Sequence, residues 1–343
     1  MTDLDTRMAD EFRQAPQAVE RQAQSLARPL AELVARLQRR PPQVVVTCAR
    51  GSSAHAATFA KFLIERHLGI PVAPAAPSIA TIYGQRLRLE NQLFLAISQS
   101  GRSDDLIEQA MAARTAGALT AALVNATDSP LAAACEFVLP IAAGAERSVA
   151  ATKTFVATLS ALLRLIASWA EDDALRAALA RLPDRLAAAA EQDWSEALRT
   201  FAANISLVTI GRGPTLAIAR EAALKLKEVC NLHAEAFSGA EFLHGPVALV
   251  SLRYPILLFM PTDAAGAGLQ RLAEDLRHKG AAVFCAEPGE PAPGRLPAVA
   301  VDHPETDAVC LVQSFYAMLV RLAQLLGTDL DRPRHLEKIT RTR

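Results

Sequence analysis

Two kinds of segment alternate along the chain: short runs of apolar residues, and longer stretches with apolar positions at helical spacing. In the first half the apolar runs cover residues 44–48, 93–97, 119–124 and 137–141. Runs this short, with no charged residue and only Thr47 and Thr120 as polar positions, are typical of strands that are buried on both faces. Their alternation with helical stretches predicts a parallel sheet with helices on both sides.

The same pattern recurs in the second half of the chain. Apolar runs return at residues 205–210, 255–260, 281–285 and 297–301. Corresponding strand ends keep a nearly constant spacing, since Gly51 and Gly213 are 162 residues apart and Ile97 and Met260 are 163 apart. A constant spacing indicates a duplicated unit, so we expect two α/β domains of the same kind.

These predicted elements divide the chain into four parts. They are an N-terminal helical segment at 1–40, a first domain at 41–195, a second domain at 196–330 and a C-terminal tail at 331–343. A chain of 343 residues is long enough to bury a core in each of two domains.

The charge balance and the apolar pattern argue against several classes of partner. Lys plus Arg is 36 and Asp plus Glu is 36, so the chain lacks the basic excess of a typical nucleic-acid binder. The longest apolar stretch, residues 155–170, is interrupted by Arg164 and is short for a membrane span. The acidic N-terminus lacks the apolar core of a signal peptide. We therefore expect a cytoplasmic protein that binds neither nucleic acid nor a membrane.

Motifs for metals and nucleotides are missing from the sequence. The five cysteines contain no Cys-x-x-Cys pair, and no His-Glu-x-x-His or Walker A sequence occurs. Neither glycine-rich turn completes Gly-x-Gly-x-x-Gly. We expect no metal site, no disulfide framework and no dinucleotide, whereas the motifs leave binding of a mononucleotide open.

Serine-rich turns follow two of the predicted strands. Ser52 and Ser53 come after the first strand, and the sequence Ser98-Gln99-Ser100-Gly101-Arg102-Ser103 comes after the second. Ligands of open α/β sheets bind outside the carboxyl ends of the strands, and hydroxyls beside a helix N-terminus suit a phosphate. The alternative is that Ser100 or Ser103 only caps the following helix. The pattern alone leaves both interpretations open.

In the second half, Glu221, Lys225 and Glu228 share one face of a predicted helix. One interpretation is a solvated ladder of ion pairs on the surface. The other is a carboxylate base held beside an ammonium, which suits proton transfer at a carbon next to a carbonyl. Of the nearby histidines, His244 before Gly-Pro is a better candidate for catalysis than His233, because it lies on a predicted loop.

Seven short motifs then occur in the order in which a known family carries them. They are RGSS at 50–53, SQSG at 98–101, ERSVAATK at 146–153, ALKLKE at 223–228, HAEA at 233–236, HGP at 244–246 and PRHLEK at 333–338. Together they resemble the sugar isomerase (SIS) family. Within that family the sequence is similar to the isomerase half of glucosamine-6-phosphate synthases and to stand-alone glucosamine-6-phosphate deaminases.

The resemblance implies two tandem SIS domains, each a parallel β-sheet flanked by helices in three layers, and a homodimer with the active site at the subunit interface. It also implies which residues bind a small-molecule sugar phosphate. By motif, the phosphate would be held by Ser98, Gln99, Ser100 and Ser103, with Ser52 and Ser53 in the same pocket and the backbone of Val149 against the sugar.

The catalytic roles are implied in the same way. Glu228 would move the proton between C1 and C2, and Lys225 would support it electrostatically. His244, from the partner subunit, would open the sugar ring. Lys338 on the tail would reach C2 of the open-chain sugar.

The resemblance predicts the reaction of an amino-sugar phosphate deaminase, in which glucosamine 6-phosphate and water give fructose 6-phosphate and ammonia. This reaction implies that neither a metal nor an organic cofactor is needed, because the substrate's own amine provides the imine. The loop at 50–53 is more like the deaminase branch, and Arg102 stands where synthases carry an acidic residue. The first cysteine is Cys48, inside a predicted strand, so we expect no glutaminase nucleophile and therefore ammonia release. Galactosamine 6-phosphate or a fructosamine 6-phosphate cleaved by a deglycase are alternative substrates, and a non-catalytic sensor of sugar phosphates is the alternative of another class.

Overall fold

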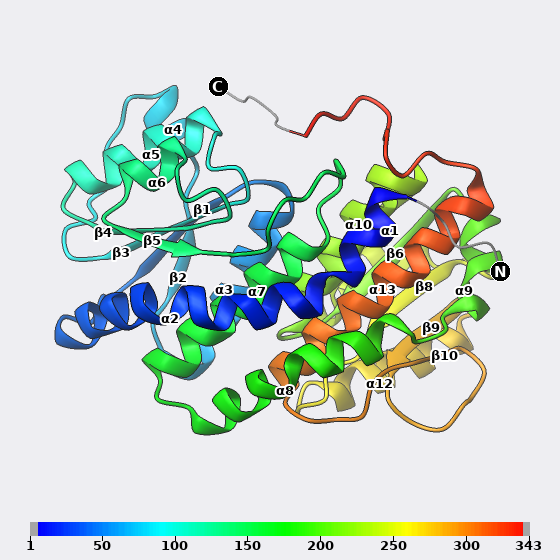
Figure 1. The fold of residues 1–343 in the computed structure, drawn as a ribbon. Helices are drawn as coiled ribbons and strands as arrows, with labels where there is room; N and C mark the ends of the chain where they lie inside the picture. Colours follow the sequence, from blue (N-terminus) through cyan, green and yellow to red (C-terminus); the bar gives the residue numbers. More distant parts are fainter. Residues whose placement is uncertain (1–5, 339–343) are drawn as a thin grey trace. The chain divides into compact units, whose positions relative to one another are not determined.

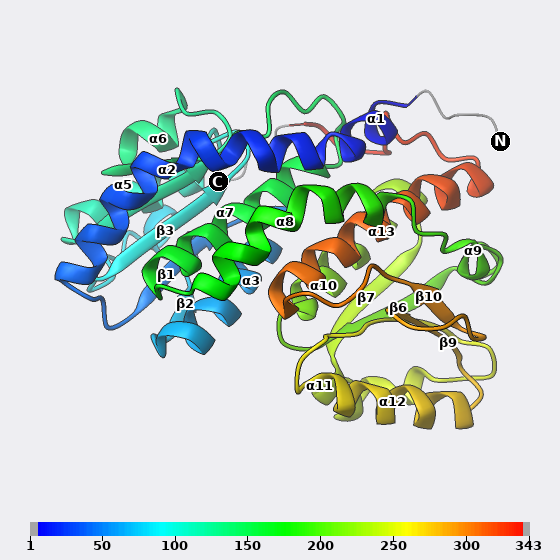
Figure 2. The same cartoon turned by 60° about the horizontal axis from the view of Figure 1, so that its bottom comes forward.

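A computed structural model describes residues 6–338 of the chain, which forms two compact units (Figures 1 and 2). We call them the first-sheet unit and the second-sheet unit. The first-sheet unit comprises Gln17–Glu146, Lys153–Leu179 and Glu337–Arg343. The second-sheet unit comprises Met1–Pro16, Arg147–Thr152 and Ala180–Leu336.

The first sheet is built from strands that follow the predicted apolar runs closely. Its strands are β1 (Val45–Ala49), β2 (Val72–Pro74), β3 (Leu93–Ser98), β4 (Leu119–Val124) and β5 (Phe137–Pro140). The accompanying helices are α2 (Ala15–Arg39), α3 (Gly51–Leu68), α4 (Ser78–Thr81), α5 (Asp104–Thr115), α6 (Pro130–Ala134), α7 (Lys153–Trp169) and α8 (Asp173–Ala190). The unit boundaries fall inside α2 and α8.

The second sheet repeats this plan. Its strands are β6 (Ser206–Gly211), β7 (His233–Ser238), β8 (Pro255–Phe259), β9 (Ala282–Glu287) and β10 (Arg295–Pro297). Its helices are α1 (Arg7–Arg13), α9 (Ser195–Ala202), α10 (Thr215–Cys230), α11 (Gly239–Leu243), α12 (Gly266–His278) and α13 (Pro304–Leu326), with a 3₁₀ turn, η1, at Pro246–Leu249.

The two sheets share one topology. The strand orders are β2-β1-β3-β4-β5 and β10-β9-β8-β6-β7, and every neighbouring pair is parallel. In each sheet the second strand lies outside the first, and the remaining strands follow on the other side. This identity confirms the predicted fold class, two parallel sheets flanked by helices. It also places a topological switch point between β1 and β3, and another between β6 and β8, where ligands of such sheets bind.

Apolar side chains cover both faces of each sheet. On one face of the first sheet, Phe94 and Ala96 of β3 pack with Leu106 and Ala110 of α5, while α3 and α7 lie on the other side (Figure 2). In the second sheet α11 and α12 cover one face, and α10 and α13 cover the other. Burial on both faces explains why the central strands contain almost no polar positions.

Of the helices between residues 6 and 338, α13 is the one long and apolar enough to cross a membrane. Most of its apolar window, 72%, is buried inside the structure. The apolar residues of α13 therefore form the core of the second-sheet unit, against α9 and α10.

The sequence pattern misplaced one edge strand and did not predict two others. The predicted strand at 297–301 is wrong, because the strand that pairs with β9 is β10, which ends at Pro297. β2 and β7 were not predicted. β7 contains exposed polar residues such as His233 and Glu235, because an edge strand has only one neighbour and is less buried than a central one.

Candidate functional site

At the switch point of the first sheet, the two serine-rich turns lie side by side. β1 and β3 pair in parallel, with Ala49 opposite Ile97, so the turns that follow both strands lie at the same end of the sheet, beyond the carboxyl ends of its strands. The turn after β1 runs directly into α3, and the turn after β3 leads into α5. Two helix N-termini, whose first backbone N–H groups have no acceptor within the helix, therefore lie here, a favourable arrangement for an anion.

The serines of these turns do not serve mainly as helix caps. Ser103 occupies the N-cap position of α5, yet its side chain makes no capping hydrogen bond, and α3 has no side-chain cap either. Ser52, Ser53 and Ser100 are partly exposed. Their placement favours the phosphate interpretation over the cap interpretation.

The second turn is shaped by its own hydroxyls and by a glycine. Ser98 Oγ accepts the backbone N–H of Gly101 at 3.1 Å, and Ser100 Oγ accepts the N–H of Arg102 at 3.3 Å. Gly101 has φ of +62°, and a Cβ there would lie 2.0 Å from Ser129 Oγ. Only glycine fits this position, because both the left-handed conformation and the close packing exclude a side chain.

An ion pair ties the two turns together. Arg50 follows β1, and its Nε and Nη2 donate to Asp105 Oδ2 at 2.9 and 2.8 Å. Asp105 lies in the first turn of α5, and its carboxylate is 2% exposed. The pair therefore fixes the N-termini of α3 and α5 relative to each other within the first-sheet unit.

In the second-sheet unit, α10 carries a buried cluster of charges. Lys225 Nζ lies 3.3 Å from Glu221 Oε1 and 2.5 Å from Glu228 Oε2. Tyr316 of α13 donates to Glu221 at 3.4 Å. The side chains of Glu221 and Lys225 are 0% and 1% exposed, whereas that of Glu228 is 20% exposed. The solvated ion ladder is thus the wrong interpretation of this helix face.

The electrostatics of this cluster keep Lys225 charged. Burial by itself lowers the pKa of Lys225, but the carboxylates of Glu221 and Glu228 outweigh burial and raise that pKa above its ordinary value. The charged ammonium lies directly against the carboxylate of Glu228. Glu228 is the member of the cluster that solvent or a ligand can reach, so it can accept and return a proton.

His244 lies close to α10 in sequence but in a different environment. It is exposed, it caps the C-terminus of the short helix α11, and Gly245 behind it has φ of +137°. The imidazole of His244 is therefore accessible to solvent and to a ligand.

Val149 and Lys338 lie on segments without regular structure. Val149 is half-buried in the segment Arg147–Thr152 of the second-sheet unit. Lys338 belongs to the first-sheet unit, and its Nζ lies 3.9 Å from Oε2 of the buried Glu146. Glu146 also accepts the N–H of Thr154, at 3.3 Å, at the start of α7. The tail lysine thus has an acidic neighbour at the base of the 146–153 motif.

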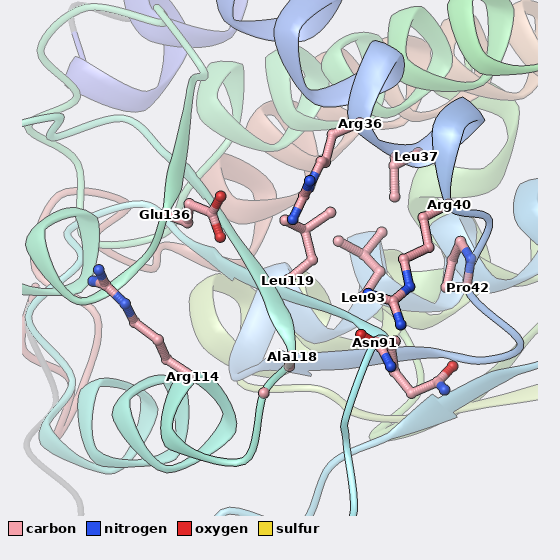
Figure 3. A pocket seen from close by; sticks show the side chains of 12 residues that line it. Arg36, Leu37, Arg40, Pro42, Asn91, Leu93, Arg114, Ala118, Leu119 and Glu136 are labelled. Carbon is pink, nitrogen blue, oxygen red and sulfur yellow. The ribbon is translucent and has the colours of Figure 1, made fainter.

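A pocket of about 180 Å³ lies at the opposite end of the first sheet, near the starts of β3 and β4, and is a separate feature (Figure 3). It is lined by Arg36 and Arg114, among others, and none of the site residues predicted from the sequence lines it. Arg36 and Arg114 lie in the last turns of α2 and α5, where cations complement the negative end of the helix dipole. The same dipoles disfavour an anionic ligand here, so the helix ends account for these arginines.

Residues 6–338 contain no group of three His, Cys, Asp or Glu side chains arranged to hold a metal ion. All five cysteines are free and buried. Burial raises the pKa of Cys48 to about 12 and that of Cys135 to about 11. These thiols are poor nucleophiles and poor ligands in the folded protein.

The profile of the SIS domain family matches residues 41–168 and 201–326, one match on each sheet. The chain belongs to the SIS domain family.

Known proteins extend this result. A glutamine–fructose-6-phosphate aminotransferase (isomerizing) of Symbiobacterium thermophilum is 35% identical over 319 residues, which cover 86% of this SIS chain and 51% of that protein. The chain thus spans about half the length of the curated relatives it matches. The crystal structure of a candidate phosphosugar isomerase from Silicibacter pomeroyi is 46% identical, with a TM-score of 0.90, and the match covers 95% of this chain and 100% of that one.

A glucosamine-6-phosphate deaminase from Thermotoga maritima has the same fold, with a TM-score of 0.77 over 98% of this chain and 100% of that one. Its sequence identity is 20%, so this likeness concerns the fold.

Three residues of these sites were not among those predicted from the sequence. Glu221 had a signal in its i, i+4 spacing to Lys225, but only its burial distinguishes it from a surface residue. Asp105 looks like an ordinary acidic residue in a first helical turn. Glu11, whose carboxylate contacts a segment 136 residues away, had no local signal at all.

Proposed function

We propose that this SIS protein is a sugar-phosphate isomerase that acts on an amino sugar, converting glucosamine 6-phosphate and water into fructose 6-phosphate and ammonia. The observation that carries the proposal is the carboxylate of Glu228, held 2.5 Å from the buried ammonium of Lys225 and still partly exposed. Such a group is suited to take a proton from a carbon next to a carbonyl and to return it to the neighbouring carbon.

The first-sheet unit would hold the phosphate. Ser98, Ser100 and Ser103 present hydroxyls at the N-terminus of α5, with Gln99 beside them, and Ser52 and Ser53 do so at the N-terminus of α3. These residues offer only neutral donors and helix dipoles, which together suit a phosphate dianion that must also be released. The phosphate is remote from the reacting carbons and would act as a handle.

The second-sheet unit would carry the proton transfers. His244 opens the ring by moving a proton between the ring oxygen and O1, which frees the C1 aldehyde. Glu228 then removes the proton from C2 and delivers it to C1, while one proton of the amine passes to O1, which leaves a C2 imine made from the substrate's own nitrogen. Water adds to C2, ammonia leaves, and the C2 ketone of fructose 6-phosphate remains. No redox step occurs, and the substrate supplies the imine nitrogen.

Lys338 is proposed to approach C2 of the open chain, and Lys225 to support the site electrostatically. The relatives named as isomerizing aminotransferases, and the 46% identical phosphosugar isomerase candidate, support sugar-phosphate isomerisation. The loop Arg50-Gly51-Ser52-Ser53 supports the deaminase direction, since it is more similar to the deaminase branch of the family.

We also propose that the protein acts as a homodimer, with His244 contributed by the partner subunit. Leu243, Leu249 and Leu252 are large apolar residues exposed on the segment around His244. Large exposed apolar side chains close together in sequence favour a surface that a second copy covers.

The decisive experiment measures ammonia and fructose 6-phosphate formed from glucosamine 6-phosphate by the purified protein. Equal amounts of both products are the expected result. Galactosamine 6-phosphate and a fructosamine 6-phosphate serve as parallel substrates, and release of ammonia from either one alone would reassign the substrate. Interconversion of glucose 6-phosphate and fructose 6-phosphate without ammonia release would leave an isomerase and refute deamination. Tight sugar-phosphate binding without turnover of any substrate would mean a non-catalytic sensor.

A further inference from the structure

Helix α1 lies outside both ranges matched by the family profile, yet it is firmly docked in the second-sheet unit. Its N-terminus is capped by Thr6, whose hydroxyl accepts the N–H of Ala9 at 3.3 Å. Near its C-terminus, the carbonyl of Phe12 accepts Nε2 of Gln313 from α13 at 2.8 Å. Met8 and Phe12 are buried against this unit. Helix α1 is therefore held firmly within the second-sheet unit.

The carboxylate of Glu11, on α1, contacts a segment 136 residues further along the chain. Its Oε1 accepts the backbone N–H of Arg147, and its Oε2 accepts the backbone N–H of Ser148 at 3.0 Å. The hydroxyl of Ser148 also contacts Oε2. Glu11 is 5% exposed and Ser148 is 1% exposed. Within residues 6–338 no cationic side chain forms an ion pair with Glu11, so these donors are what balances its buried charge.

The segment that Glu11 holds has no helix or strand of its own between residues 147 and 152. Its backbone order therefore depends on side-chain contacts rather than on a regular hydrogen-bond ladder. Val149 follows the two residues whose N–H groups Glu11 accepts. It is half-buried, and its own N–H donates to no group in the described part of the chain. The hydroxyl of Ser148 also donates to the carbonyl of Ala150 at 3.1 Å. The backbone is therefore held just before Val149, at the N–H groups of Arg147 and Ser148, and just after it, at the carbonyl of Ala150.

We infer that Glu11 is a positioning residue that sets the backbone of Val149 at the angle required to meet the hydroxyls of the sugar. This inference rests on the proposed function, in which the backbone of Val149 contacts the substrate. It assigns a role in substrate binding to the helix that precedes the first SIS domain. The proposed phosphate turns at the start of α3 and α5 make no contact with Glu11, so Glu11 would affect recognition of the sugar and leave recognition of the phosphate unchanged.

The test compares Glu11→Gln with Asp10→Asn, a matched change at an exposed position of the same helix. Glutamine keeps the size of the side chain but turns one oxygen into an NH₂ group, which faces an N–H donor and repels it. We expect KM for glucosamine 6-phosphate to rise about 10-fold in Glu11→Gln, with kcat reduced less, because a binding contact shared by ground and transition states is lost. The inhibition constant of inorganic phosphate should change by less than about twofold, since the phosphate loops are untouched.

Hydrogen exchange provides a readout that does not depend on catalysis. In Glu11→Gln the amides of Arg147 and Ser148 should exchange at least about 10-fold faster, and Asp10→Asn should leave them unchanged. Unchanged exchange in Glu11→Gln would show that Glu11 does not hold the amides of Arg147 and Ser148, whatever the protein catalyses. Faster exchange with an unchanged KM overturns the positioning role and leaves a structural contact. If the wild-type protein neither binds nor converts any amino-sugar phosphate, the proposed function fails. The exchange rates then still decide whether Glu11 holds the amides of Arg147 and Ser148.

Discussion

Arg50 and Asp105 connect the two turns that end β1 and β3. Both Nε and Nη2 of the guanidinium donate to a single carboxylate oxygen, Oδ2, at 2.9 and 2.8 Å. The other oxygen of Asp105 accepts the N–H of Leu106 at 2.9 Å. A local helix-cap contact and a long-range ion pair thus share one buried carboxylate, and the spacing of the proposed phosphate loops depends on it.

The first prediction concerns this pair. Asp105→Asn removes the negative charge and should lower the free energy of unfolding by about 1–3 kcal/mol, since a buried charge-assisted contact is lost. It should also raise KM for the sugar phosphate, because the N-termini of α3 and α5 are no longer fixed. Chemical denaturation and steady-state kinetics measure the two effects. Asp104→Asn, at the exposed neighbouring position, is the control. Equal effects of both substitutions would refute the role of the pair.

A second prediction concerns Glu228. If this carboxylate moves the substrate proton, Glu228→Gln should reduce turnover about 100-fold or more, the usual scale of acid–base catalysis. The fold should survive, because Glu221 still pairs with Lys225, and the loss of stability should be about 1–2 kcal/mol. Glu235→Gln on β7 is exposed and provides the control. Near-normal turnover with a large drop in melting temperature would assign Glu228 to the core alone.

The serine turn leads to a third prediction. Ser98→Ala combined with Ser100→Ala should raise KM for the phosphorylated sugar far more than it lowers kcat, because the phosphate is bound similarly in the ground and transition states. Two hydrogen bonds to backbone N–H groups are lost as well, so stability should fall by about 1–2 kcal/mol. Ser25→Ala, on the exposed side of α2, should change neither. An unchanged KM would require a phosphate site elsewhere.

The tail provides the fourth prediction. Deleting residues 336–343 should leave the fold and the oligomeric state intact by thermal melting and sedimentation, since terminal segments contribute little to stability, yet it should remove most activity. Lys338→Arg should also lose activity, because a larger planar guanidinium does not replace a compact amine beside C2. Arg334→Lys, at an exposed tail position, serves as the control. Residues 339–343 lie outside the described part of the chain. A truncated protein with near wild-type turnover would remove Lys338 from the mechanism.

A fifth prediction follows from the buried thiols. Burial raises the pKa of Cys230 and Cys310 to about 12 and that of Cys285 to about 11. Thiols in the unfolded chain ionise near pH 8.5, so the native state binds more protons above that pH and its stability should fall as the pH rises further. At pH 8 the native protein should resist a thiol reagent that labels all five cysteines in guanidinium chloride. Rapid labelling of the native protein at pH 8 would contradict this burial.

The sequence by itself determined the central architecture. Short, mostly apolar runs, repeated after a nearly constant spacing, are sufficient to place β1, β3, β4, β6 and β8, because a strand buried on both faces is apolar at most of its positions. The serine turns were also visible, since they stand directly after those strands. The family motifs then gave roles to residues that no pattern of spacing could separate.

Only the tertiary structure decided which polar residues are buried and what they contact. Glu221 and Lys225 look the same in sequence on a solvated helix and on a buried one, and the packing of α13 against α10 makes the difference. The edge strands β7 and β10 were missed or misplaced because pairing with a neighbour, rather than apolar content, defines them. Glu11 contacts Ser148 across 137 positions of sequence. No local pattern encodes such a contact, because it exists only once the chain has folded back on itself.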